Sequence, residues 1–135
     1  MKPIPFITLL LPPFLLLAAC GNNTTMSQSV ESTLKNIASQ YIEAEYKGDK
    51  ELLMRVTREE ARKSVEEDQL SIFKDQHLDQ IINTKITKIS DSEYDLVVTV
   101  SSSPKEKEQP TNYFENLTIT KQNEEWLITK VTRDK

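Results

Sequence analysis

The chain is 135 residues long, with 17 basic and 21 acidic residues and a formal net charge of −4. This balance excludes a strongly basic protein, and a mildly acidic domain is a poor candidate for binding nucleic acid or anionic lipid head groups. The single cysteine excludes an internal disulfide, and the length leaves room for one small domain beside an N-terminal leader.

Residues 1–19 have the composition of a secretory signal peptide. Lys2 supplies the positive start, and the stretch from Ile4 to Ala19 carries no charge. The sequence Leu17-Ala18-Ala19-Cys20-Gly21 resembles the lipobox of bacterial lipoproteins, in which the cysteine thiol receives a diacylglyceryl group and the preceding peptide is removed. We therefore expect lipidation of Cys20, which would become the first residue of the mature protein.

Two other interpretations of the leader compete with the lipobox. An uncleaved transmembrane helix needs about 20 apolar residues, whereas this run is shorter and contains Pro5, Pro12 and Pro13. A plain secretory signal with an incidental cysteine is the stronger rival. With the lipid, two acyl chains would hold the protein stably at the extracytoplasmic face of the cell membrane. The residue usage is typical of a Gram-positive organism.

Residues 20–29 predict a flexible lipidated tether, because they are rich in Asn, Thr, Ser and Gln and contain hardly any apolar side chain. The remaining residues, 30–135, carry the periodic patterns of a folded domain. We therefore expect three segments: a signal peptide over 1–19, the tether over 20–29 and one domain over 30–135.

The first half of this domain has a helical pattern. Gly48 is placed to end the first helix, and Asp49 is placed to cap a second helix over 50–56. Thr57 and Glu60 have capping-box spacing, which predicts a third helix with Thr57 as its N-cap. We expect that helix to bend or stop at the charged segment 66–68. The apolar stripe of the first helix consists of Val30, Leu34, Ile37, Ala38, Tyr41 and Ile42.

After His77 the apolar residues alternate, which predicts strands over 81–89, 94–101, 113–121 and 126–131. A charged connection over 102–110 has a proline near each end and predicts a loop. Short connections favour antiparallel neighbours. The sequence therefore predicts an α+β domain, with N-terminal helices packed on a curved antiparallel sheet of about four strands.

Two segments resemble NTF2-like proteins of the cystatin-like fold. Tyr41-Ile42-Glu43-Ala44 followed by Tyr46-Lys47-Gly48-Asp49 resembles the end of their first helix, and Leu117 to Ile128 is similar to their last hairpin. The resemblance extends from about Val30 to Val131, and small lipoproteins with such domains are common in Gram-positive bacteria. The family includes isomerase-like and dehydratase-like enzymes as well as binding domains, so the fold alone does not choose between these functions.

Few side chains offer catalytic chemistry. His77 lies between Asp75 and Asp79, and a carboxylate could orient its imidazole as a general base. A histidine among charged residues at a helix-to-strand junction is more often solvated. With one histidine and a lipidated cysteine, we expect no zinc site. With only two glycines in the chain, we expect no phosphate-binding loop. No cofactor is expected.

The aromatic side chains are the candidate ligand-binding residues. Tyr41, Tyr94 and Tyr113 are candidates because the resemblance implies tyrosines that donate hydrogen bonds into a pocket. Trp126 could stack on a ligand. The competing interpretation is that all four residues pack in the hydrophobic core with their polar atoms at the surface.

We expect a non-enzymatic binding or interaction module that contacts another envelope protein and no nucleic acid. The concave sheet face and the loop from Lys105 to Glu108 are the surfaces to examine. A small-molecule-binding or isomerase-like or dehydratase-like pocket protein is the alternative, and a surface-spacing lipoprotein without a ligand stays open. The pocket alternative requires an apolar cavity with a buried ionisable group, and it fails if that space is filled by Leu34, Ile37, Leu96, Leu117 and Ile128.

Overall fold

The computed structural model describes residues 26–105 and 109–134, so Cys20, the leader and most of the tether lie outside the described residues. None of the helices in this described part is long and apolar enough to cross a membrane. The elements are α1 (Gln28–Lys47), α2 (Lys50–Val56), α3 (Glu59–Glu66), a 3-10 turn η1 (Ser71–Phe73), β1 (Gln76–Ser90), β2 (Glu93–Pro104), β3 (Thr111–Gln122) and β4 (Glu125–Asp134).

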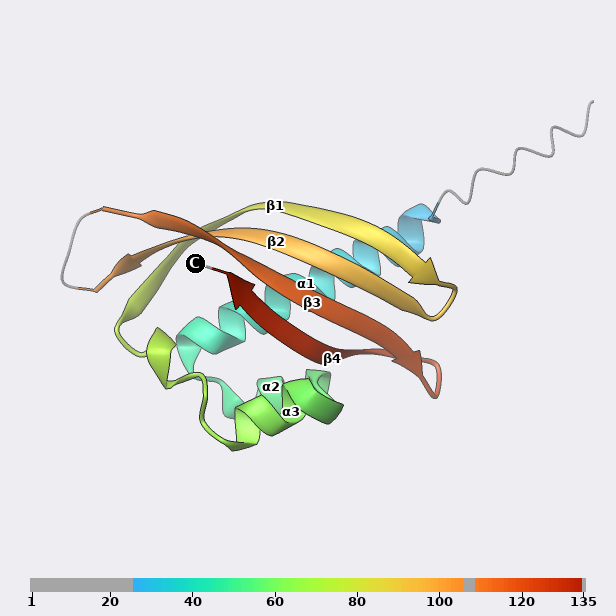
Figure 1. Cartoon of the computed structure of the whole chain (residues 1–135), viewed down its shortest axis with the longest axis horizontal. Coiled ribbons are helices and arrows are strands. Elements are labelled where there is room, and N and C mark those ends of the chain that lie inside the picture. The colour runs from blue at the N-terminus through green and yellow to red at the C-terminus, as the bar shows by residue number, and fades with distance from the viewer. Residues whose placement is uncertain (1–25, 106–108, 135) are drawn as a thin grey trace, which may run out of the picture.

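The four strands form one antiparallel sheet in the order β1-β2-β3-β4. Helix α1 crosses one face of this sheet, and α2 and α3 lie beside β4 (Figure 1). The pairing of β1 with β2 shifts register at three places along β1. This arrangement confirms the predicted α+β class, with helices packed on a four-stranded antiparallel sheet.

The elements extend somewhat beyond the predicted bounds. Helix α1 begins at Gln28 because the Ser27 side chain accepts a hydrogen bond from the Val30 amide at 3.3 Å, so residues 28 and 29 belong to the helix and not to the tether. Gly48 ends α1 with a φ of 69°, as predicted, because glycine adopts this left-handed conformation without strain. Strand β1 begins at Gln76, which places His77 on a strand and not in a loop.

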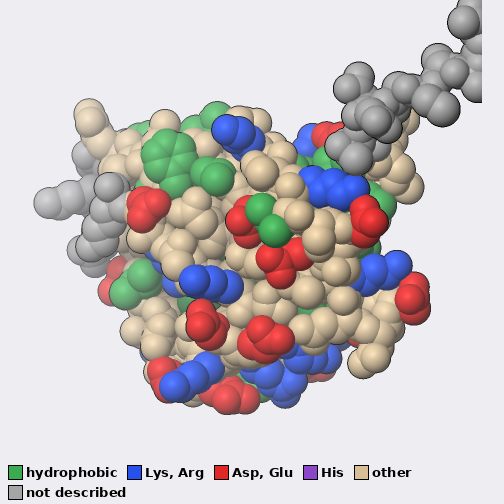
Figure 2. All heavy atoms as spheres, turned by 45° about the vertical axis from the view of Figure 1, so that its right-hand side comes forward, with side chains coloured by type: hydrophobic (Ala, Val, Ile, Leu, Met, Phe, Trp, Pro, Cys, Tyr) green, Lys and Arg blue, Asp and Glu red, His purple; other side chains and the backbone are tan. Residues whose placement is uncertain are grey.

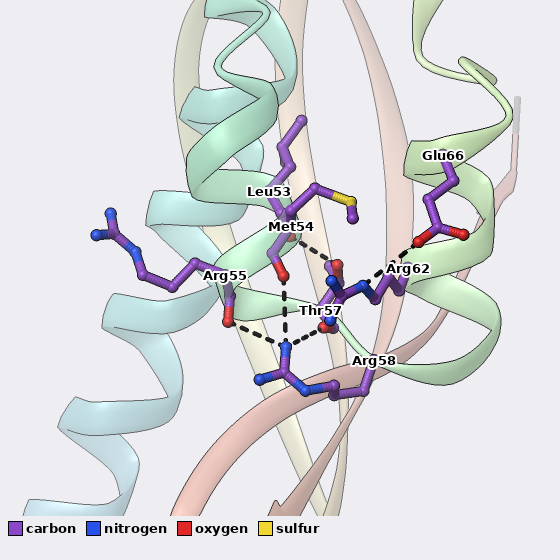
Figure 3. Close-up of polar contacts among 7 residues, drawn as sticks. All are labelled: Leu53, Met54, Arg55, Thr57, Arg58, Arg62 and Glu66. Atoms are coloured by element: carbon purple, nitrogen blue, oxygen red, sulfur yellow. Dashed lines mark hydrogen bonds and ion pairs between the residues drawn. The ribbon is translucent and has the colours of Figure 1, made fainter.

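The capping box predicted for the third helix is wrong. Thr57 is fully buried and its hydroxyl donates backward to the Leu53 carbonyl at 2.6 Å, so it is not free to cap α3 (Figure 3). Arg58 is the N-cap residue, and its guanidinium instead donates to carbonyls at the end of α2. Thr57 also forms a parallel bridge to Ile128, and the Arg58 amide donates to the Ile128 carbonyl at 2.9 Å. The chain between α2 and α3 is thus attached to β4.

The hydrophobic core fills the space between α1 and the sheet. Leu34, Leu96, Leu117 and Ile128 are at most 1% exposed, and Ile37 packs against them while partly buried. The five residues named as the test of a filled interior therefore do lie together in the core. Such close packing of apolar side chains is what stabilises a sheet covered by a helix.

The opposite face of the sheet is polar. Thr118 donates to Asp95 at 2.8 Å across β3 and β2, and Asn116 donates to Asp134 at 3.1 Å across β3 and β4. Phe114 is a large apolar exception, 46% exposed. On the face drawn in Figure 2, acidic and basic side chains of the described residues are interspersed, so neither sign of charge dominates that face.

Candidate functional site

Three charged side chains converge in the interior where α1 ends, and we call Glu45, Glu115 and Arg133 the carboxyl cluster. Glu45 follows Tyr41 by one helical turn on the buried stripe of α1. Glu115 lies on the buried side of β3, directly opposite Arg133 of β4 in the register. The side chains of Glu45 and Glu115 are 0% exposed and that of Arg133 is 20% exposed.

Arg133 lies between the two carboxyl groups. Its Nη2 donates to Glu45 Oε1, and also to the Tyr41 hydroxyl at 3.2 Å. Its Nε lies 3.5 Å from Glu115 Oε1, which is an ion-pair distance but too long for a normal hydrogen bond. The guanidinium also lies over the ring of Phe73, 5.2 Å from the ring centroid, in a cation–π contact.

Several buried polar atoms of this region have no hydrogen-bond partner among the described residues. The atoms are Glu45 Oε2, both carboxyl oxygens of Glu115, Arg133 Nε, and the hydroxyls of Tyr46 and Tyr113. Each buried polar group left unpaired costs about 1–3 kcal/mol. The cluster is therefore a costly arrangement that hydrophobic packing elsewhere must offset.

The charges of the cluster do not balance, since two carboxyl groups face one guanidinium. Burial raises the pKa of Glu115 well above its ordinary value, and the neighbouring Glu45 raises it further. Burial alone would lower the pKa of Arg133, but Glu45 and Glu115 hold that pKa above its ordinary value. Glu115 therefore keeps its proton to a higher pH than an exposed glutamate would.

The tyrosines beside the cluster are neutral hydrogen-bonding groups. Burial raises the pKa of Tyr41 far above its ordinary value, and Glu45 adds to the effect. Burial also raises the pKa of Tyr46 to about 12. Neither phenol ionises near neutral pH, so they serve as donors and acceptors rather than as bases.

Two open clefts adjoin this end of the fold and share Tyr46, Lys47 and Lys105. The first cleft has a volume of about 510 Å³, and the second about 280 Å³. Glu45 is the member of the carboxyl cluster that lines the second cleft. The first cleft is also lined by Glu43, Gln76, His77, Leu78, Asp79, Gln80 and Ile81, and the second by Gly48, Lys50, Leu53, Val65, Asp68, Leu70 and Lys74.

The four predicted ligand-binding residues lie in two separate places. Tyr41 and Tyr113 are near the carboxyl cluster, where Tyr41 is fully buried and Tyr113 half-buried. Tyr94 and Trp126 lie at the opposite end of the sheet, with ring centroids 5.5 Å apart in an edge-to-face contact, and the Lys121 ammonium lies 5.9 Å from the Trp126 ring. The structure thus brings Tyr94 and Trp126 into contact and places Tyr41 and Tyr113 at the other end of the sheet, so the four do not form one site.

His77 is exposed on β1 and lines the first cleft together with Asp79. The Asp79 carboxylate accepts a hydrogen bond from Ser103 at 3.2 Å. Within residues 26–105 and 109–134, no group of three or more His, Cys, Asp or Glu side chains is placed to hold a metal ion.

Glu45, Glu115 and Arg133 were not predicted as site residues, although the apolar periodicity of α1 and β3 marks the two glutamates. Residues 113, 115, 117 and 119 share one face of β3, and that face is the buried one. A charged residue within such an alternating apolar series is a signal for a buried ionisable group. Glu45 gives the same signal on α1, four residues after Tyr41.

Comparison with known proteins defines the fold. No protein-family model and no curated protein sequence matches this chain. A solved domain of unknown function with a cystatin-like fold from Nostoc punctiforme aligns with a TM-score of 0.62 and 13% identity, over 80% of this chain and 78% of that one. A second protein of unknown function from the same organism aligns with a TM-score of 0.62 and 12% identity, over 81% of this chain and 94% of that one.

A third solved structure is described as an NTF2-like protein involved in plasmid conjugation. It aligns with a TM-score of 0.57 and 14% identity over 81% of this chain. The aligned region spans only 40% of that longer protein. Together these structures show that the chain has the cystatin-like, NTF2-like fold, as the sequence resemblance implied.

Proposed function

We propose that this protein is a lipid-anchored, extracytoplasmic module that binds another component of the bacterial cell envelope without catalysing a reaction. The observation that carries the proposal is the pair of clefts that meet at Tyr46, at the end of α1. Both clefts are open and lined by mixed polar and apolar side chains, which suits recognition of a protein surface. Cys20 would supply the membrane anchor.

The packing of the interior supports binding over catalysis. Leu34, Leu96, Leu117 and Ile128 occupy the space that an enclosed substrate would need. The carboxyl cluster holds ionisable groups, but the side chains of Glu45 and Glu115 have no exposed surface. A general acid or base must come within hydrogen-bond reach of its substrate. A partner that docks in the clefts would meet lysines and Tyr46 instead.

The expected anchor and one structural relative support a proposal for the kind of partner. A tethered domain contacts proteins that share its membrane surface. The NTF2-like protein involved in plasmid conjugation has the same fold, which supports a conjugation or secretion apparatus as the partner class. The fold alone does not identify the partner, so the anchor and the binding surface need separate tests.

The anchor is tested by metabolic labelling. Cells expressing the full chain and fed labelled palmitate are expected to incorporate the label, and Cys20→Ser is expected to abolish both the label and the membrane fraction of the protein. A Cys20→Ser variant that kept its label would contradict lipidation at Cys20, and unlabelled protein in the medium would favour the plain secretory signal.

The binding surface is tested by site-specific crosslinking in intact cells. A photoreactive residue in place of Lys47, which lines both clefts, is expected to give a discrete crosslinked envelope protein. The same residue in place of Asp91, 98% exposed in the β1–β2 turn at the opposite end of the sheet, is the matched control. Equal crosslinking at both positions, or none above background at position 47, would contradict the proposal.

The filled interior rules out an enclosed pocket, so the second candidate is a small molecule bound in the open second cleft. Glu45 lines the second cleft, and beside it Glu115 has a raised pKa. Binding of a small ligand to the purified protein, lost in Glu45→Gln and retained in Lys130→Gln, would support this candidate.

A further inference from the structure

The carboxyl cluster lacks one positive charge. Glu45 and Glu115 are both fully buried, and among the described residues Arg133 is the one cation within ion-pair distance of either. Two buried negative charges against one positive charge are costly, because the interior solvates charge poorly. A proton is the smallest species that removes the excess charge without any change in packing.

The groups that face the cluster do not supply another cation in the interior. From α1, Tyr41 and Tyr46 face it, and the phenols of both are neutral. From β3, Tyr113 lies two residues before Glu115 on the same side of the strand. The other charged groups near Glu45 are those that line the second cleft with it. They are Lys47, Lys50, Asp68, Lys74 and Lys105, and all five are exposed.

We infer that Glu45 and Glu115, which both face Arg133, share one retained carboxyl proton. We further infer that loss of this proton releases the end of β4 from α1. The release follows from where Arg133 lies. It is the penultimate residue of β4, and its bonds to Glu45 and Tyr41 are the side-chain hydrogen bonds that join β4 to α1 in the described part of the chain. A second buried carboxylate would repel the first and lack hydration, and water can reach the pair only if this junction opens.

The release would reach the clefts that the proposed function uses, although the proton site does not depend on that function. Glu45 lines the second cleft and the adjacent Tyr46 lines both. A cluster that relaxes on proton loss therefore changes the walls of both clefts. Binding there would be stronger in the protonated state, which is the state with the ordered cluster.

The direction of the pH effect is fixed by linkage. The folded protein keeps a carboxyl proton that the unfolded chain loses near pH 4.3, the ordinary glutamate value. Between that pH and the raised pKa of Glu115, the folding equilibrium constant should fall about tenfold for each unit that the pH rises. The contribution of Glu45 and Glu115 to the free energy of unfolding is therefore greatest at the acidic end of this pH range and declines as the pH rises.

Denaturant unfolding of the full-length chain between pH 5 and 8 tests the proton. Glu115→Gln mimics the protonated carboxyl, so we expect it to remove the tenfold loss per pH unit. Glu125→Gln, at an exposed position on β4, should behave as the wild type does. The same pH slope in Glu115→Gln and wild type would overturn the inference.

Two measurements on the wild-type protein test the retained proton and the release of β4 even if Glu115→Gln fails to fold. The infrared spectrum of the wild type at pH 7 should contain the carbonyl band of a protonated carboxyl, and absence of that band would overturn the retained proton. Hydrogen-exchange protection factors for residues 131–134 should fall at least tenfold at alkaline pH in the wild type. Unchanged protection would overturn the release of β4.

Discussion

Replacing Arg133 by methionine is expected to destabilise the fold by about 3–5 kcal/mol at neutral pH. The substitution leaves Glu45 and Glu115 buried without a cation, and removing one partner of a buried ionic group costs this much. Methionine matches the apolar stem of arginine, so the loss comes from charge and not from volume. Urea unfolding monitored by far-ultraviolet circular dichroism measures it.

The controls for this prediction separate charge from packing. Lys130→Met, at an exposed position of the same strand, should change stability by less than about 0.5 kcal/mol. Adding Glu45→Gln and Glu115→Gln to Arg133→Met should recover part of the loss, because no buried charge then remains. Equal free energies of unfolding for Arg133→Met and Lys130→Met would show that the fold does not require the ion pairs of the carboxyl cluster.

Replacing Leu117 by alanine is the second change with a large expected effect, a destabilisation of about 2–5 kcal/mol. Leu117 is 1% exposed, and the sheet register places it opposite Leu96 on β2 and Val131 on β4. Truncation would remove buried methyl groups and leave a cavity that close-packed neighbours fill only in part. Thermal and urea unfolding of the purified protein measure the loss.

Phe114 provides the matched control on the same strand. It points to the polar face of the sheet and is 46% exposed, so Phe114→Ala should cost less than about 1 kcal/mol. Equal losses at positions 114 and 117 would mean that both faces of β3 are buried in solution. That outcome would contradict a sheet with one face covered by helices and the other face free.

The regular elements were predictable because their signals are local. The apolar stripe of α1, the glycine at its end and the Asp49 cap of α2 were all confirmed, with Asp49 accepting from the Leu52 amide at 3.0 Å. The four strands follow from alternation along the chain. The capping box failed because Thr57 is drawn into the core by its bridge to Ile128, a contact between residues far apart in sequence.

The carboxyl cluster could not be predicted as a site, because its members come from three elements. Glu45 and Arg133 are separated by 88 residues, and only the packing of α1 on the sheet brings them together. Each acidic residue carried a local signal, since it interrupts a buried apolar series. Their pairing with one shared arginine depends on strand register, which the sequence alone does not determine.

The attachment of the α2–α3 connection to β4 also limits how copies of the domain could assemble. A sheet can grow by adding strands wherever backbone groups at its rim stay unpaired. The bridge from Thr57 to Ile128 and the bond from the Arg58 amide occupy the middle of the β4 rim. Strand addition at the middle of β4 is thereby obstructed, which disfavours continuous growth of the sheet across this rim.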